Sequence, residues 1–266
     1  MKTYNLESII RAKQALKKAA TLHIMDTNVS LIDIGFRIHD QDQNCIEPEL
    51  TVRVHVHRKL RGADFASLAE KESQRVISAE RIGFAVDVIE ASYNAQAVSN
   101  DHADFTSTTV YNNLTKAIGT VGGSVCDRFT KEEMILGSWS TLCGSWTKQS
   151  DLSIRQNGIN TPAHCTRHSV HQFLDAAVAK LTTDQAQIKN PLGAGAVTGA
   201  IFPRLGMKVI KSGSISGAAS GIIDGICGCA LINLDGIRCI VKNIVRIVPD
   251  NSSERFCTKG DSGAWW

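Results

Sequence analysis

The chain has 266 residues, enough for one large domain or two ordinary ones with a real core. Apolar residues make up 43% and charged residues 21%, which is ordinary for a globular protein. The net charge of +3 and the aromatic fraction of 6% do not indicate a nucleic-acid partner. No stretch approaches the roughly 20 apolar residues that span a bilayer, and no signal peptide is evident at the N-terminus. We therefore expect no membrane contact and a cytoplasmic location.

The first 91 residues predict a small α+β domain. Residues 5–20 place apolar side chains on one stripe with basic residues elsewhere, which predicts an amphipathic helix. Residues 32–38 and 50–57 then alternate between apolar and polar side chains, as strands with one buried face do. A second helix over 63–78 and a short strand over 85–89 follow.

Two histidines lie on the same face of the second predicted strand. His55 and His57 are two residues apart, so a metal pair is conceivable. No third ligand matches them, and we expect both to be exposed on the polar face of the strand. No metal site is predicted here.

Residues 92–117 are polar with few large apolar side chains, which predicts a linker. From residue 118 to 266 the chain changes to short apolar runs separated by glycine, among them 119–125, 134–137, 196–202 and 237–248. Many short strands with glycine-containing turns are typical of an all-β barrel or sandwich. No glycine-rich phosphate loop is present, so we expect no nucleotide cofactor and no cofactor of another kind.

Eight cysteines are scattered along the chain, and none has the C-x-x-C spacing that favours zinc. Because no export signal accompanies them, buried thiols are expected rather than disulfides. The cysteines are Cys45, Cys126, Cys143, Cys165, Cys227, Cys229, Cys239 and Cys257.

Near its end the chain carries Gly260-Asp261-Ser262-Gly263. Serine catalysis needs a hydroxyl, a base that takes its proton, and amides that hold the oxyanion. The glycines let the backbone curl so that the amides of Gly260 and Ser262 can point at one spot. The motif therefore predicts a nucleophile turn with Ser262 as the nucleophile.

The order of several motifs resembles the trypsin-like serine peptidase family, in its cytosolic group of bacterial members and plant Narrow-leaf proteins. Residues 119–122 resemble the G-T-x-G that opens the first barrel, and 259–265 resemble the first seven positions of K-G-D-S-G-A-x-W. Residues 174–179 are similar to V-D-A-A-I-A, and 206–213 to G-x-x-V-x-K-x-G. The N-terminal segments 51–60 and 86–90 also resemble the domain that precedes the peptidase in bacterial members.

This resemblance implies a trypsin-like double β-barrel, preceded by the small α+β domain. It implies that Asp175 orients the base and that the amides of Gly260 and Ser262 form the oxyanion hole. The family's histidine block, L-S-N-W-H-V-L-C-G-S, matches residues 136–145, where the base position is Ser140. Serine cannot accept a proton near neutral pH, so the triad is predicted to be broken. A buried Asp175 would then need another donor, and we expect the Ser140 hydroxyl to serve.

Three histidines just upstream of Asp175 offer an alternative base: His164, His168 and His171. We consider them weaker, because loop histidines are usually solvated and nothing fixes their tautomer. Peptidases of this family continue past the nucleophile turn with more strands, whereas this sequence ends at Trp266, so an incomplete second barrel is expected.

Two functions remain open. The chain is either a serine endopeptidase-type protein with impaired activity or a non-catalytic pseudopeptidase that binds peptides or acts in assembly. The partner would accordingly be a polypeptide substrate or another protein.

Overall fold

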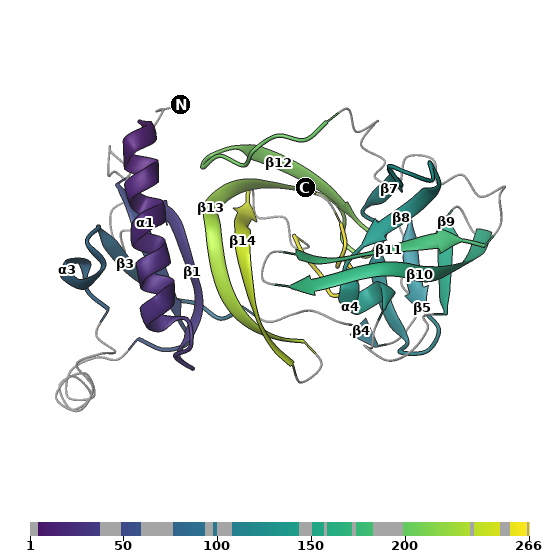
Figure 1. The fold of residues 1–266 in the computed structure, drawn as a ribbon, viewed down its shortest axis with the longest axis horizontal. Helices are drawn as coiled ribbons and strands as arrows, with labels where there is room; N and C mark the ends of the chain where they lie inside the picture. Colours follow the sequence, from purple (N-terminus) through teal and green to yellow (C-terminus); the bar gives the residue numbers. More distant parts are fainter. Residues whose placement is uncertain are drawn as a thin grey trace.

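In the computed structural model, the described part of the chain is mostly β structure, with one long helix and two sheets (Figure 1). The structure describes residues 5–37, 49–59, 77–93, 98–99, 108–143, 151–156, 159–171, 174–182, 199–234, 237–250, 256–264 and 266. Within these ranges, no helix is both long enough and apolar enough to cross a lipid bilayer.

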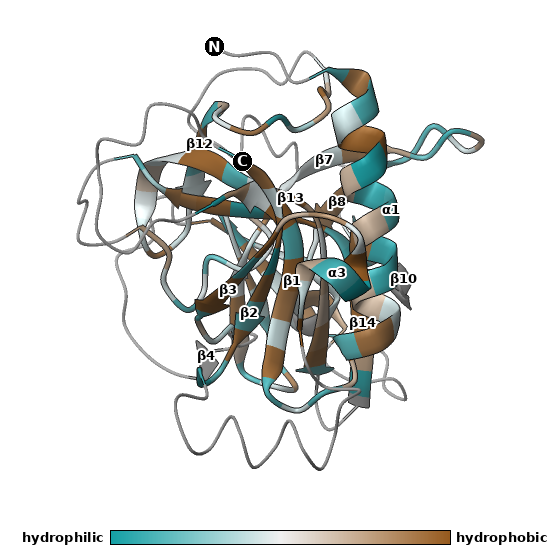
Figure 2. Cartoon of the chain, turned by 90° about the vertical axis from the view of Figure 1, so that its left-hand side faces the viewer, coloured by the Kyte–Doolittle hydropathy of each residue, from teal (hydrophilic) through white to brown (hydrophobic). Residues whose placement is uncertain are grey.

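The N-terminal helix α1 (Leu6–His23) begins at Asn5, whose side chain accepts a hydrogen bond from the N–H of Ser8. Alanines recur on its inner face, where Ala12, Ala15 and Ala19 are buried against the first sheet. Small side chains at this spacing let the helix axis approach the sheet closely. Along α1, hydrophilic and hydrophobic residues alternate in Figure 2, as expected for an amphipathic helix.

The first sheet has six strands in the order β12-β13-β1-β2-β3, with β14 on the other edge of β13. Its strands are β1 (Val29–Phe36), β2 (Leu50–Val56), β3 (Val86–Glu90), β12 (Lys208–Gly213), β13 (Gly217–Leu234) and β14 (Ile237–Pro249). Strand β1 pairs antiparallel with β2 on one side and with β13 on the other. The N-terminal strands and strands from the end of the chain thus complete one sheet together.

The long strand β13 curves strongly, and with β14 it forms a half-barrel beside β1 (Figure 1). One face of β1 and β2 packs against α1 through Ile32, Val52 and Val54. The opposite face carries polar side chains and turns toward β13 and β14. Both faces of β1 and β2 are therefore covered, and every residue of β2 is buried.

The second sheet has eight strands in the order β4-β6-β5-β9-β10-β11-β8-β7. They are β4 (Val98–Ser99), β5 (Thr109–Asn112), β6 (Ala117–Thr120), β7 (Gly123–Cys126), β8 (Glu133–Gly137), β9 (Leu152–Gln156), β10 (Ile159–His171) and β11 (Leu174–Leu181). A short helix, α4 (Trp139–Leu142), packs on this sheet, and Trp139 and Leu142 are fully buried in its core. A second short helix, α3 (Ala79–Ile82), lies near α1.

Most of the expected elements are present. The helix at 5–20 and the strands near 32–38, 50–57 and 85–89 are confirmed as α1, β1, β2 and β3. Residues 60–76, which hold most of the helix expected at 63–78, lie outside the described residues.

Two segments differ from expectation. The range 92–117, expected as a linker, contains β5, which pairs with both β6 and β9 because its β-branched and apolar residues fit the sheet and Val110 is fully buried. Residues 199–202 of the strand expected at 196–202 form no strand, and Ile201 and Phe202 are exposed. The predominance of β structure in the second half is confirmed. The double barrel stays a prediction.

Candidate active site

The Ser262 turn, residues Gly260–Gly263, follows the first sheet and reaches strand β6 of the second. Gly260 and Gly263 both have φ of +97°, in the region that side chains disfavour. A Cβ on Gly263 would collide with the carbonyl oxygen of Thr120. The N–H of Thr120 donates to the carbonyl of Ser262 over 2.8 Å, and its hydroxyl donates to the carbonyl of Gly260 over 3.0 Å. The Gly260–Gly263 segment thus forms a tight turn fixed to β6.

Asp261 holds the turn from the other side through a buried ion pair. Its carboxylate lies 2.7 Å from Nζ of Lys211 on β12, and the two side chains are only 2% and 1% exposed. The carboxylate also accepts hydrogen bonds from the N–H groups of Ile215, Ser216 and Thr258. Burial alone would raise the pKa of Asp261, but these donors outweigh it and hold the pKa below its usual value. Asp261 is thus an anion that orders the turn.

The hydroxyl of Ser262 meets another hydroxyl. Its Oγ lies 2.7 Å from Oγ of Ser138, which in turn lies 3.0 Å from Oγ1 of Thr141. Ser138 is the residue before α4 and Thr141 lies within it. The structure therefore places a chain of three hydroxyls at the predicted nucleophile, and none of them accepts a proton near neutral pH.

Asp175 lies on β11 beside the start of α4. Its Oδ1 accepts a hydrogen bond of 3.0 Å from the backbone N–H of Trp139. Burial raises the pKa of Asp175, and this N–H only partly offsets the rise. The side chain of Ser140, predicted to donate to Asp175, lies outside the described residues. The structure does bring Asp175 to the residue that precedes Ser140.

The predicted oxyanion amides have no acceptor among the described residues. The N–H groups of Gly260 and Ser262 donate to no group that the structure describes, whereas the neighbouring Asp261 N–H donates to Thr258. Unused amides in a rigid turn are what a bound carbonyl oxygen would require. Their role stays a prediction.

Of the three histidines considered as alternative bases, the structure describes the side chain of His164 alone. His164 lies on β10 opposite Lys180 of β11, and within the described part of the chain no hydrogen bond joins it to Ser262 or Asp175. The side chains of His168 and His171 lie outside the described residues.

Sequence reasoning missed two residues at this turn, Ser138 and Lys211. Lys211 stands within the matched segment 206–213, and a lysine between Ile210 and Ser212 in a strand was the available signal. Ser138 had no such signal, because its contact with Ser262 depends on how α4 packs against the turn.

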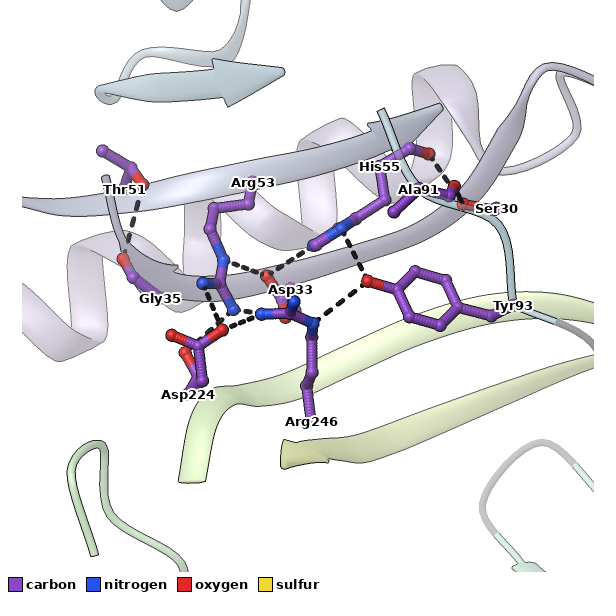
Figure 3. A network of polar contacts seen from close by, with 10 residues as sticks. All are labelled: Ser30, Asp33, Gly35, Thr51, Arg53, His55, Ala91, Tyr93, Asp224 and Arg246. Carbon is purple, nitrogen blue, oxygen red and sulfur yellow. Dashed lines mark hydrogen bonds and ion pairs between the residues drawn. The ribbon is translucent and has the colours of Figure 1, made fainter. Parts of the chain in front are cut away.

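A second polar cluster lies between β1, β2 and the half-barrel strands (Figure 3). We call it the Arg53 cluster, and its members are Asp33, Arg53, His55, Tyr93, Asp224 and Arg246. Arg53 is fully buried; its Nε and one terminal nitrogen each lie 2.7 Å from a carboxylate oxygen of Asp33. Its other terminal nitrogen lies 2.9 Å from Asp224 on β13, which also pairs with Arg246 of β14. Two cations therefore meet two anions.

His55 is wholly buried in this cluster, so the expectation that it is exposed was wrong. Its Nε2 lies 3.3 Å from Asp33 and its Nδ1 lies 3.0 Å from the hydroxyl of Tyr93. The reason is that β13 and β14 cover the polar face of β2, which the sequence pattern predicted to face solvent. His57, one residue beyond β2, is exposed as expected.

The Arg53 cluster is a structural junction by its geometry. Burial would raise the pKa of Asp33, but hydrogen bonds from His55 and Arg53 lower it below its usual value. A Cβ on Gly225 of β13 would collide with Asp33, so glycine is required where β13 approaches. No group of three or more His, Cys, Asp or Glu residues within the described ranges is arranged to hold a metal ion.

Comparisons with known proteins give little support to any one family. No protein-family model matches the chain, and no curated protein matches it. Among solved structures, the crystal structure of Deg5 shares 14% sequence identity over 60% of this chain and 73% of that one. The TM-score between the two structures is 0.35.

Proposed function

We propose that the chain is a pseudopeptidase of trypsin-like type, which binds polypeptides in the cytoplasm and does not hydrolyse them. The observation that carries this proposal is the 2.7 Å contact between the hydroxyls of Ser262 and Ser138. A serine hydroxyl becomes a nucleophile only when an adjacent base removes its proton. Here the adjacent group is a second hydroxyl, so Ser262 stays protonated and unreactive.

The fixed turn supports a binding role. The ion pair of Asp261 with Lys211 and the contacts of Thr120 keep the amides of Gly260 and Ser262 in place without a substrate. Two fixed donors can hold the carbonyl oxygen of a bound peptide. In this protein they would position a polypeptide without promoting its cleavage.

A weak peptidase is the second candidate, and the position of Asp175 favours it. The carboxylate contacts the first residue of α4, next to the predicted base position at Ser140. In a well-studied serine protease, oxyanion binding alone leaves roughly 10³- to 10⁴-fold catalysis over water. Slow hydrolysis of this kind would persist without a base.

A fluorophosphonate probe, which reacts with activated serines, distinguishes the two candidates. We expect no labelling of the unmodified protein at Ser262 over hours. Ser140→His should restore labelling and cleavage of an unfolded casein substrate, and adding Ser262→Ala should abolish both. Ser124→His, at an exposed serine of β7, is the matched control and should restore neither.

Two outcomes would count against the proposal. Labelling of the unmodified protein at Ser262 would show an activated serine and support the weak peptidase. Failure of casein, unfolded and present in excess, to bind the unmodified protein in fluorescence anisotropy would remove the polypeptide-binding role.

A further inference from the structure

Two cysteines from different elements bring their sulfur atoms together beside the candidate site. The Sγ atoms of Cys143 and Cys165 lie 2.6 Å apart. Cys143 directly follows α4, and Cys165 lies on β10, which packs against that helix. A disulfide bond has a length of about 2.0 Å, so a small approach of the two sulfurs would suffice to form one.

Both residues belong to the apolar core of the second sheet, but they are exposed to different degrees. Cys143 is 6% exposed, whereas Cys165 is half-buried at the margin of the core. The hydrogen bond with Cys165, together with burial, raises the pKa of the Cys143 thiol. Cys143 is therefore a protonated thiol at neutral pH, and Cys165 is the sulfur that a dissolved reagent reaches first.

We propose that Cys143 and Cys165 form a reversible disulfide by exchange with a small-molecule disulfide of the glutathione type. The thiolate of Cys165 attacks one sulfur of the reagent, which releases one small thiol and leaves a mixed disulfide. Cys143 then loses its proton and attacks the Cys165 sulfur, which releases the second small thiol. The two protein thiols lose two electrons and two protons, and the reagent disulfide gains both.

The bond would fasten α4 to β10 at the end of the helix opposite the Ser262 turn. The other end of α4 follows Ser138 and begins with Trp139, which contact Ser262 and Asp175. A helix of four residues has few hydrogen bonds of its own, so its position depends on packing. The disulfide would also link two residues 22 positions apart in the sequence and so restrict the unfolded chain. This proposal does not rest on the proposed function.

The test is a redox titration of the folded protein in buffers of increasing glutathione disulfide, followed by acid quench, alkylation and peptide mass spectrometry. We expect Cys143 and Cys165 to lose alkylation with one common midpoint. Their linked peptide should be about 2 Da lighter than the two thiol peptides together. The oxidised protein should melt roughly 5 °C or more above the reduced protein, because the cross-link restricts the unfolded chain.

Single variants identify the order of the exchange. Cys143→Ala should trap glutathione on Cys165, and Cys165→Ser should leave Cys143 fully alkylated in every buffer. Cys229→Ser, at a buried cysteine of β13 in the other sheet, should leave the titration unchanged. The proposal is overturned if Cys143 and Cys165 stay alkylated in the most oxidising buffer. It is also overturned if either one pairs with a different cysteine, or if the unmodified protein retains glutathione on Cys165.

Discussion

The Arg53 cluster and the Ser262 turn are both buried and polar, but they satisfy their groups differently. In the Arg53 cluster each charge meets an opposite charge, and Arg53 reaches from β2 to both Asp33 and Asp224. At the Ser262 turn only Asp261 has an opposite charge, that of Lys211, while the Ser262 hydroxyl meets a hydroxyl. Charge pairing thus supports the fold in both places, whereas reactivity would need a base that the described part of the turn lacks.

The largest loss in the free energy of unfolding is expected when the Arg53 cluster is broken. Arg53→Met removes both contacts to Asp33 and leaves a buried carboxylate without its cation. Breaking a buried pair in this way costs about 3–5 kcal/mol. The measurement is the free energy of unfolding in urea.

Arg37→Met is the matched control, because Arg37 pairs with Glu49 at the surface, where such pairs are worth about 1 kcal/mol or less. The double variant Asp33→Leu/Arg53→Met should recover part of the loss, since it leaves neither buried charge unpaired. A loss below about 1 kcal/mol for Arg53→Met would contradict the cluster's role.

The next largest loss in the free energy of unfolding is expected when the ion pair between Asp261 and Lys211 is broken. Lys211→Met leaves Asp261 buried, but three backbone N–H groups still stabilise the carboxylate. We therefore expect a somewhat smaller loss than for Arg53, about 2–4 kcal/mol. Lys208→Met, on the same strand but in an exposed pair with Asp250, should change the free energy of unfolding by less than about 1 kcal/mol. Equal losses for the two lysine variants would contradict the assignment.

The stability of the folded protein should depend on pH with opposite signs at Asp175 and Asp261, the two aspartates of the site. Burial raises the folded-state pKa of Asp175. The contribution of Asp175 to the stability of the folded protein is therefore fully present below its unfolded-state pKa, and it is lost as the pH rises through the folded-state pKa. Asp175→Asn should therefore match the unmodified protein in acid and exceed it in stability at neutral pH.

The folded-state pKa of Asp261 is lowered by Lys211 and backbone donors against the effect of burial. Its contribution is present above the unfolded-state pKa and is lost as the pH falls through the folded-state pKa. Asp261→Asn should therefore be less stable than the unmodified protein at neutral pH, with a gap that narrows in acid. Melting curves from acid to neutral pH measure both variants, and gaps of the same sign would refute this difference.

The smallest effect is expected at the hydroxyl chain. Ser138→Ala removes the hydroxyl that contacts both Ser262 and Thr141, and each neutral hydrogen bond is worth about 0.5–1.5 kcal/mol. Ser124→Ala, at an exposed serine, should leave the free energy of unfolding unchanged within error. A loss above about 3 kcal/mol at Ser138 would indicate a charged group at the turn.

Periodicity predicted the local structure well, and it failed where distant segments meet. The alternation in residues 50–57 correctly predicted a strand and placed Arg53 and His55 on one face. It could not predict what covers that face, because Asp224 and Arg246 come from strands far along the chain. The sequence pattern therefore predicted that the polar face of β2 is exposed, whereas the structure shows that this face is buried and its side chains are paired.

At the candidate site, the short motif predicted a turn because glycine positions and their φ angles are local properties. The residues 260–263 do form that turn, with positive φ at both glycines. The contact between Ser262 and Ser138 depends on the packing of α4 against the turn, and no local pattern carries that information. The roles of Ser140 and Asp175 rest on the resemblance and stay predictions.

Strand β13 is synthesised long after strands β1 and β2, which it joins in the sheet. Arg53 and its partner Asp224 are 171 residues apart, and synthesis at roughly 5–20 residues per second separates their appearance by about 10–30 s. During that interval the nascent β1 and β2 can pack against α1, but the Arg53 face has no cover. Its charged side chains keep this uncovered surface hydrated, so the nascent chain exposes a polar face there instead of an apolar one. The same residues that join the finished sheet thus keep this face polar while it is exposed on the growing chain.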